Sequence, residues 1–479
     1  MCKNLSFVFV MFIISFSFYS LCIAQSDSVI VTIDVVGHPA ALLYNPSDNK
    51  IYCGYDGTDS VTIVDGAKDS VIATLPAGSL GQFLSSNPLD HNRTDDKIYC
   101  ANAERGNVTV IDGTDDSVIT TITVGSYPRV LVHNTIDNKV YCGNCQSHNV
   151  SIINGATDSL LRTVSVGLAP RDLVYNSTDN KIYCANGGSD NVSIIDGDGD
   201  TVRTTVPVGD GPYSLVYNFQ QNKIYCTNIS SHTVTIINGT GDTVLAIVSV
   251  ESYPCALAYN PTNNKVYCAN SQSNSVSIID GIGNSIITTL AVGSTPLALA
   301  YNSKNNKIYC ANALSDNVTI IDGAGDSVIA TVPFVDYPIA LAYDSTNNKI
   351  YCANYDSSSI SVIACSPPTA VEEDQETQII PHFSLKQNYP NPFNPTTKIP
   401  FTVHGSQFIV HRPIHTSLKI YNILGQKVRT LVDGPKRAGN YEVIWDGKDD
   451  LGKEVASGIY FYQLKAGNYS ETKKMLLLR

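Results

Sequence analysis

Residue types that could perform chemistry are sparse in this 479-residue chain. Cys142-Gly-Asn-Cys145 is a single CxxC without the second pair that a zinc site needs. Asp196-Gly-Asp-Gly-Asp200 resembles part of a calcium loop, but it lacks the distal glutamate and aligns with turns elsewhere in the chain. No two histidines of the first 365 residues lie at metal-ligand spacing; they are His38, His91, His133, His148 and His232. We expect no metal and no cofactor, and no catalytic residue stands out, although a catalytic set assembled across distant segments stays open.

Tyrosines, arginines and histidines in polar loops are the better candidates for function. Aromatic and arginine side chains on a rigid scaffold are typical of recognition surfaces. The alternative is that these positions vary without any functional role. The ligand-binding candidates are His38, Tyr55, Arg105, Tyr127, Arg129, His148, Arg171, Tyr213, Tyr253 and Tyr337.

A segment that reads Lys-Ile/Val-Tyr-Cys occurs eight times and sets the spacing of these loops. The first gap between its tyrosines is 47 residues and the other six are 42. A period near 42 in β-rich sequence predicts a propeller with one four-stranded blade per repeat. The tyrosines are Tyr52, Tyr99, Tyr141, Tyr183, Tyr225, Tyr267, Tyr309 and Tyr351.

Residues 295–335 show the four strands expected of one blade. The third and fourth are joined at Asp322-Gly323, where glycine is expected to supply a positive φ. The first three strand types occur eight times, but the fourth follows only the first seven. The missing copy is at residues 27–33, which read like residues 326–332. We therefore expect an all-β, eight-bladed propeller in which Ser28–Val36 pairs with Ile360–Ile363 and closes the last blade.

The expected strand directions place two sets of loops on one face. Strands one and three of a blade run parallel, so the loops before strand one and after strand two should open together. The candidate residues above belong to these loops. The second repeat has five extra residues within Ser85–Asp96, which we expect to lengthen the turn between strands one and two on the opposite face.

Eight of the thirteen cysteines occupy the same repeat position. Equivalent residues in neighbouring blades are about 10 Å apart, whereas a disulfide tolerates Cα separations only up to about 7 Å. We therefore expect buried thiols that act as small apolar side chains. Cys145, Cys255 and Cys365 lie outside this register, and their redox state stays open.

The N-terminus reads as a signal peptide spanning residues 1–24, with Lys3 before an apolar run and Cys22-Ile23-Ala24 before the cleavage point. An uncleaved anchor or a lipoprotein is the alternative. No later segment is apolar enough to insert in a membrane. Residues 1–365 carry 17 Lys and Arg against 32 Asp and Glu, a formal charge of −15, which argues against nucleic acid and anionic membranes as partners.

The composition changes after Cys365. Residues 366–382 read as an acidic linker, and residues 383–479 contain about seven short strand-like runs without the 42-residue period, a pattern typical of a β-sandwich. The only tryptophan, Trp445, is expected to anchor the core of this second domain.

Two family resemblances cover most of the chain. Tyr351-Cys-Ala-Asn354, Ser361-Val-Ile363 and Ala330-Thr-Val-Pro333 resemble the YVTN family of β-propeller repeats, over residues 26–365. That family often has seven blades, whereas this sequence gives eight. The resemblance implies an extracellular or surface protein, usually with a binding or structural role.

The C-terminal region resembles the sorting domain of type IX secretion substrates, which is similar to the Ig-like domain of flagellar hook-cap proteins. The motifs are residues 387–396, residues 420–426, Trp445-Asp-Gly447 and residues 457–462, and His404–His415 departs as an apparent loop insertion. The resemblance implies passage across the outer membrane by secretion machinery that recognises residues 383–479. Whether the domain is then cleaved stays open.

Three functions remain compatible with the sequence. The favoured one is a secreted or cell-surface monomer that binds an extracellular protein or glycan. A structural coat protein is the second, because the blades are so uniform. An enzyme related to lactonase or lyase propellers is the third, and it would need acid–base residues or a metal near the propeller axis.

Overall fold

The computed structural model describes residues 27–78, 80, 88–333, 335–366, 384–403, 414–436, 439–466 and 469–478. The expected signal peptide and all but the first residue of the expected linker lie outside these ranges. Within them, the helices are two 3-10 turns, η1 (Ala103–Arg105) and η2 (Ala313–Ser315). No helix of the described part is long and apolar enough to span a bilayer. The chain divides into two units, residues 1–369 and residues 370–479, which are treated separately below.

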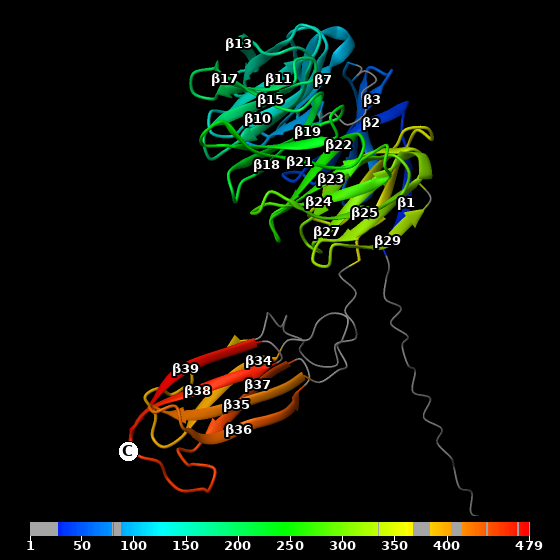
Figure 1. Ribbon diagram of the computed structural model, residues 1–479. Coiled ribbons are helices and arrows are strands. Elements are labelled where there is room, and N and C mark those ends of the chain that lie inside the picture. The colour runs from blue at the N-terminus through cyan, green and yellow to red at the C-terminus, as the bar shows by residue number, and fades with distance from the viewer. Residues whose placement is uncertain are drawn as a thin grey trace, which may run out of the picture. The chain divides into compact units, whose positions relative to one another are not determined.

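Eight antiparallel sheets of four strands each form the first unit, which is an eight-bladed propeller (Figure 1). Neighbouring innermost strands contact one another around the whole ring, and the last contacts the first. The innermost strands are β2 (His38–Asn45), β6 (Leu89–Asn92), β10 (Pro128–Asn134), β14 (Pro170–Asn176), β18 (Pro212–Asn218), β22 (Pro254–Asn260), β26 (Pro296–Asn302) and β30 (Pro338–Asp344).

The second and third strands of each blade are almost wholly buried, as expected for sheets covered by a neighbour on each face. The second strands are β3 (Lys50–Asp56), β7 (Lys97–Asn102), β11 (Lys139–Asn144), β15 (Lys181–Asn186), β19 (Lys223–Asn228), β23 (Lys265–Asn270), β27 (Lys307–Asn312) and β31 (Lys349–Asn354). The third strands are β4 (Ser60–Asp65), β8 (Asn107–Asp112), β12 (Asn149–Asn154), β16 (Asn191–Asp196), β20 (Thr233–Asn238), β24 (Ser275–Asp280), β28 (Asn317–Asp322) and β32 (Ser359–Ala364).

The outermost strands are largely exposed, and one of them closes the ring. They are β5 (Ser70–Pro76), β9 (Ser117–Thr123), β13 (Ser159–Ser165), β17 (Thr201–Pro207), β21 (Thr243–Ser249), β25 (Ile286–Ala291), β29 (Ser327–Pro333) and β1 (Ser28–Asp34). β1 pairs with β32, from Ser28 opposite Ala364 to Asp34 opposite Ser359. The predicted closure is therefore confirmed, and the N-terminal strand covers an edge of β32 that would otherwise be open.

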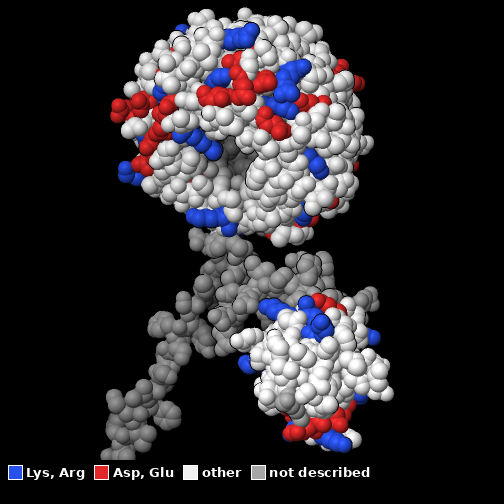
Figure 2. Space-filling model, turned by 90° about the vertical axis from the view of Figure 1, so that its left-hand side faces the viewer, with Lys and Arg blue, Asp and Glu red and all other residues white. Residues whose placement is uncertain are grey.

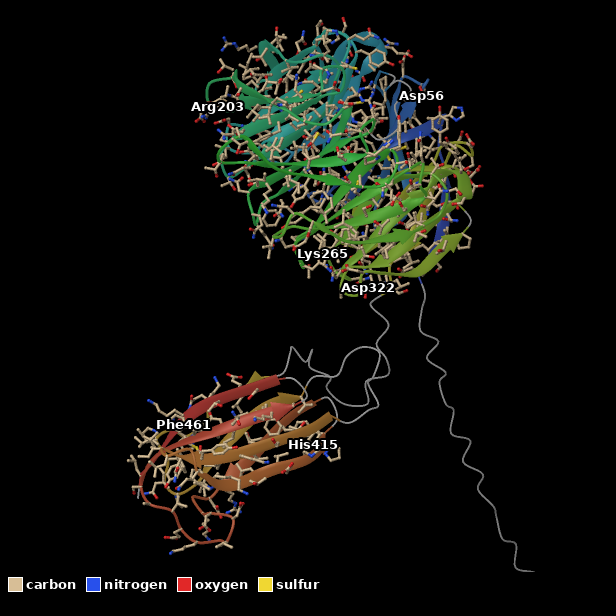
Figure 3. The ribbon with its side chains drawn as sticks, in the orientation of Figure 1. Asp56, Arg203, Lys265, Asp322, His415 and Phe461 are labelled. Atoms are coloured by element: carbon tan, nitrogen blue, oxygen red, sulfur yellow. The ribbon has the colours of Figure 1, made fainter. Side chains whose placement is uncertain are left out.

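A lysine at the start of each second strand joins its blade to the next blade. In seven blades its ammonium donates to the carboxylate directly before the outermost strand of the next blade, over 2.6–2.9 Å; the pairs are Lys50–Asp116, Lys97–Asp158, Lys139–Asp200, Lys181–Asp242, Lys265–Asp326, Lys307–Asp27 and Lys349–Asp69. Figure 3 shows Lys265 and Asp322, which opens the turn that Lys265 reaches, on the same side of the propeller. In the eighth contact, Lys223 donates to the amide oxygen of Asn284 at 2.8 Å. The main role of the repeated Lys-x-Tyr segment is therefore to connect its blade to the next one.

The glycine of the repeated Asp-Gly turn has a different role from the one predicted. In the turn after β8, the positive φ of 52° belongs to Asp116 rather than to Gly113. A Cβ atom on Gly113 would lie 2.6 Å from the carbonyl oxygen of Asp96. The glycine is needed for this close approach between two turns of one blade.

The five extra residues of the second repeat also lie elsewhere than predicted. The turn from β6 to β7 has the same length as in other blades, and Asn92 makes the same contact to the next blade, donating to Asn138 at 2.9 Å. The additional length therefore precedes β6, in the connection from β5. This connection lies on the face of the candidate loops, and its residues 79 and 81–87 are outside the described ranges.

The cysteines behave as predicted in the described part of the chain. All eleven of them there are free thiols, and the eight repeat cysteines are buried. Burial raises the pKa of Cys53, Cys100 and Cys255 to about 12. They fill space between blades as small apolar groups.

The described residues of the second unit form seven strands in two sheets. One sheet has the order β33 (Ser384–Leu385), β34 (Thr397–Val403) and β37 (Gly439–Trp445); the other has the order β36 (Lys427–Lys436), β35 (Ile414–Asn422), β38 (Gly458–Ala466) and β39 (Tyr469–Leu477). Trp445 is fully buried, with its ring 5.5 Å from Phe393 and 5.1 Å from Tyr460, as predicted for a core anchor. Residues 404–413 of the expected insertion lie outside the described ranges.

The contact between Lys223 and Asn284 allows a test of the inter-blade lysines. Desolvation lowers the pKa of Lys223, which has no carboxylate at the position that seven blades use. Asn284→Asp should raise the pKa of Lys223 and the free energy of unfolding, the latter by about 1 kcal/mol, because charged hydrogen bonds are stronger than neutral ones. Urea unfolding measures the change. The reciprocal control Asp326→Asn should lower stability by a similar amount, and an unchanged midpoint in both variants would contradict the role of these contacts.

Candidate binding site at the mouth of the central channel

The loops before the innermost strands and after the second strands meet on one face, as predicted. The N–H of Cys145 donates to the carbonyl of Tyr127 at 2.9 Å, and the N–H of Tyr355 donates to that of Tyr337 at 3.1 Å. The space-filling view shows the propeller hollowed near the middle of the ring that the innermost strands form (Figure 2). We call the ring of loops with its first innermost-strand residues the channel mouth.

Arg129, Arg171 and Tyr213 form one cluster at the channel mouth. They occupy the same position on three consecutive innermost strands, β10, β14 and β18. The Arg129 guanidinium carbon lies 5.5 Å from the centre of the Tyr213 ring, and that of Arg171 lies 6.0 Å from it. Arg129 Nη2 donates to the Tyr213 hydroxyl at 3.3 Å. Arg129 is only 1% exposed, and this burial lowers its pKa.

A second cluster lies where the last blade meets the first. The His38 ring stacks on Tyr355 at 4.7 Å, and Tyr337 lies 6.2 Å from Tyr355. His38 Nδ1 donates to the Tyr355 carbonyl at 2.8 Å, and the Tyr355 hydroxyl donates to Asp56 at 2.7 Å. These residues bring aromatic faces and a carboxylate together at the seam that closes the ring.

Three tyrosines at the channel mouth adopt a left-handed backbone. Tyr127, Tyr253 and Tyr337 have φ values of 61°, 60° and 48°. They hold the loop position directly before the innermost-strand proline, where Ala169, Gly211 and Thr295 of other blades also have positive φ. Tyr253 is 36% exposed. The scaffold thus holds three large aromatic rings at a position that smaller residues fill in other blades.

Three of the sequence candidates have structural roles instead. Tyr55 is fully buried in β3, which corrects its placement in a loop, and its hydroxyl donates to Thr62 at 2.6 Å. His148 Nδ1 accepts the N–H of Ala169 at 3.1 Å, the same bond that Asp190 makes to Gly211 at 2.9 Å in the next blade.

Arg105 lies at the end of η1 and forms an ion pair with Asp59, with both side chains about half exposed. Its charge is therefore already compensated at the surface. The structure does not bring it to either cluster of the channel mouth.

A cavity of about 150 Å³ lies below the channel mouth, between innermost strands. Its walls are mostly Ala and Leu, but Asp172 of β14 also lines it. The Asp172 carboxylate accepts the N–H of Leu173 at 2.9 Å and that of Leu215, on the next blade, at 2.7 Å. Desolvation raises the pKa of Asp172 to about 7. Asp172 is not among the sequence candidates, although the equivalent residue is Ala256, Ala298 or Ala340 in other blades, and this contrast could have revealed it.

The chemistry available in this cavity is limited. Of the described residues that line it, Asp172 and Cys255 are the ones that titrate, and burial raises the pKa of Cys255 to about 12. A single carboxyl of raised pKa supplies one half of an acid–base pair. No group of three His, Cys, Asp or Glu side chains in the described ranges has the arrangement of a metal site.

Comparisons with known proteins agree with this architecture. The model of the FlgD Ig-like domain family matches residues 404–470. No curated protein matches the chain. The structure titled dihydro-heme d1 dehydrogenase NirN in complex with DHE is 12% identical, with a TM-score of 0.56 over 83% of this chain and 76% of that chain. The Kuenenia stuttgartiensis hydrazine synthase structure is 20% identical, with a TM-score of 0.48 over 62% of this chain and 98% of that chain. At 12% identity, the likeness to the first of these structures concerns the fold alone.

The buried carboxyl of Asp172 predicts a specific pH dependence of stability. Its pKa is about 7 in the folded protein and near 3.8 when unfolded, so the folded state holds the proton more tightly. The free energy of unfolding should therefore fall as the pH rises from about 4 to about 7. Asp172→Ala installs the residue found in other blades. This variant should show a smaller difference in the free energy of unfolding between pH 5 and pH 8, as measured by urea unfolding.

Asp90 provides the control for this measurement, because burial also raises its pKa to about 7. Asp90→Val, the residue of β10 at this position, should remove its own share of the pH dependence, and the two reductions should add. An undiminished dependence in Asp172→Ala would show that this carboxyl ionises normally.

Proposed function

We propose that this protein is a secreted or cell-surface binding protein whose propeller holds an extracellular protein or glycan at the channel mouth. The observation that carries the proposal is the left-handed backbone of Tyr127, Tyr253 and Tyr337. A residue other than glycine in this conformation costs about 1–3 kcal/mol, and such strain concentrates at functional sites. The fold itself does not need these rings, because Ala169, Gly211 and Thr295 fill the same position in other blades.

The tyrosines differ in what their removal costs the fold. Tyr253→Gly should leave the free energy of unfolding unchanged or slightly raised, because strain is released while unfolded-state entropy increases. Tyr337→Gly should lower it, because the ring of Tyr337 packs against an apolar cluster. In both variants, binding to an array of neutral and acidic glycans and capture of extracellular proteins should fall by about tenfold or more. This is the loss expected when an aromatic ring that the ligand buries is removed.

Thr295→Gly is the matched control for these variants. Thr295 has the same left-handed conformation, with φ at 57°, so this change alters the backbone preference without removing an aromatic ring. Equal binding by the wild type and both tyrosine variants would reject the channel mouth as the binding site.

We further propose that the C-terminal unit directs export through the secretion machinery. The match of residues 404–470 to the FlgD Ig-like family and the sandwich of two sheets support a compact module of its own. A chain ending at residue 366 should be retained inside the producing cells, while the full chain reaches the surface or the medium. Immunoblotting of cell and medium fractions measures this, and equal release of both chains would contradict the export role.

Exposed apolar side chains on the outermost strands favour a second candidate function, a structural coat. They include Val71 and Ile72, Val118 and Ile119, Leu160 and Leu161, Val244 and Leu245, and Val328 and Ile329. Figure 3 shows Arg203 on one of these outer strands, at the periphery of the propeller. The tyrosine variants separate the two functions, because a coat assembled through outer strands would not depend on rings at the channel mouth.

A further inference from the structure

We propose that the Arg129–Arg171–Tyr213 cluster is an anion subsite that binds the carboxylate of an acidic saccharide. This inference rests on the proposed binding function and names its ligand class. Arginine is the residue best suited to this task, because its planar guanidinium donates two parallel hydrogen bonds to a carboxylate.

The first argument is the convergence of two positive charges on one ring. Both guanidinium carbons lie within 6.0 Å of the centre of the Tyr213 ring. Arg129 is almost completely buried, so its charge is poorly solvated. Cations held this close together repel each other, and an anion placed between them would be stabilised by both.

The second argument is the charge balance around the cluster. Asp172 is the acidic group on the neighbouring strand that acts on Arg129, and with a pKa of about 7 it is only partly ionised at neutral pH. Tyr127 also interacts electrostatically with Arg129. Burial raises the pKa of Tyr127, and the carboxylates of Glu104 and Asp56 raise it further. The charge of the cluster therefore becomes more positive as Asp172 takes up its proton.

The third argument comes from the other blades. The position of Arg129 and Arg171 is held by Ala40, Cys255, Leu297 and Ile339 elsewhere, and these side chains belong to one apolar cluster that lines the channel. The fold therefore accepts apolar side chains at this position. Replacing a buried charge by an apolar side chain is often neutral or stabilising, so the arginines are not explained by stability.

The surroundings favour a saccharide rather than a free ion. Tyr213, Tyr337 and Tyr355 are only partly buried, and they pack against the same apolar cluster. Aromatic faces next to hydrogen-bonding side chains offer both surfaces that a sugar ring presents, its apolar C–H groups and its hydroxyls. A carboxylate held by the arginines would orient such a sugar over the cavity.

Calorimetry with the full chain tests the subsite. Trigalacturonic acid should bind more tightly than its neutral methyl ester. Arg171→Leu, which installs the residue found at position 297, should weaken binding of the acid by about tenfold to a hundredfold, as expected for a lost charged hydrogen bond. The same variant should bind the ester as the wild type does. Arg203→Leu, on the outermost strand β17, is the control that should change neither affinity.

The outcomes separate this inference from the proposed function. If the acid and the ester bind equally, or if Arg171→Leu binds the acid normally, the anion subsite is wrong while glycan binding stands. If a triglutamate peptide binds and both saccharides do not, the anion site serves a protein partner and the saccharide class is wrong. If no probe binds, the inference fails, and the tyrosine variants decide the proposed function independently. Thermal unfolding of each variant confirms that the comparison is made on folded protein.

Discussion

The contact between a lysine of one blade and the last turn of the next blade is the constraint on which this propeller depends. Seven of the ammonium groups are paired with a carboxylate, and the eighth, that of Lys223, is paired with the amide oxygen of Asn284. Replacing the carboxylate of such a pair by an amide weakens a charged hydrogen bond, which costs about 1 kcal/mol. The blades are therefore fixed in angle as well as in order. Because the partner of Lys307 is Asp27, the same contact that joins ordinary neighbours also attaches the N-terminal strand to the ring.

A scaffold fixed in this way leaves the channel mouth free to vary. The repeated Lys, Tyr, Cys and Asn side chains are turned toward neighbouring strands and blades, where they are buried. The residues that differ between blades lie at the first position of the innermost strands and in the loop before it. Arg129, Arg171 and Tyr213 occupy positions at which other blades have Ala, Cys, Leu or Ile. The site is thus built by substitution at equivalent positions of a constant frame.

Much of the fold could be predicted because the period reports the strand register directly. The eight blades, the closing strand and the buried thiols all follow from aligning the copies. The same alignment, carried further, would have shown that Tyr55 replaces the buried Asn102 of the second blade, and that His148 replaces an Asp or Asn that holds a loop. The exposure of Tyr55 and His148 was predicted from their residue types. The equivalent residues in other blades were the better guide to whether these two side chains are buried or structural.

Other features depend on contacts between turns, strands and blades that the spacing of the repeats does not reveal. The role of the turn glycine arises from another turn of the same blade, and the pKa of Asp172 arises from burial against the next blade. The five extra residues could be placed correctly only once the turn after β6 was known to be regular. The convergence of Arg129 and Arg171 on Tyr213 depends on how far each side chain reaches across strands, which spacing alone does not give.

The position of the N-terminal strand in the last blade has a consequence for how the chain folds. Seven blades are made of strands that follow one another, so they can form from local hairpins. The last blade needs residues near position 30 to meet residues near position 360, after everything between them has been made. Contacts of such long sequence separation form slowly, because the entropy of closing a long loop must be overcome first. Until then β32 keeps an open edge, so the slowest step of folding and the period of greatest risk of aggregation coincide.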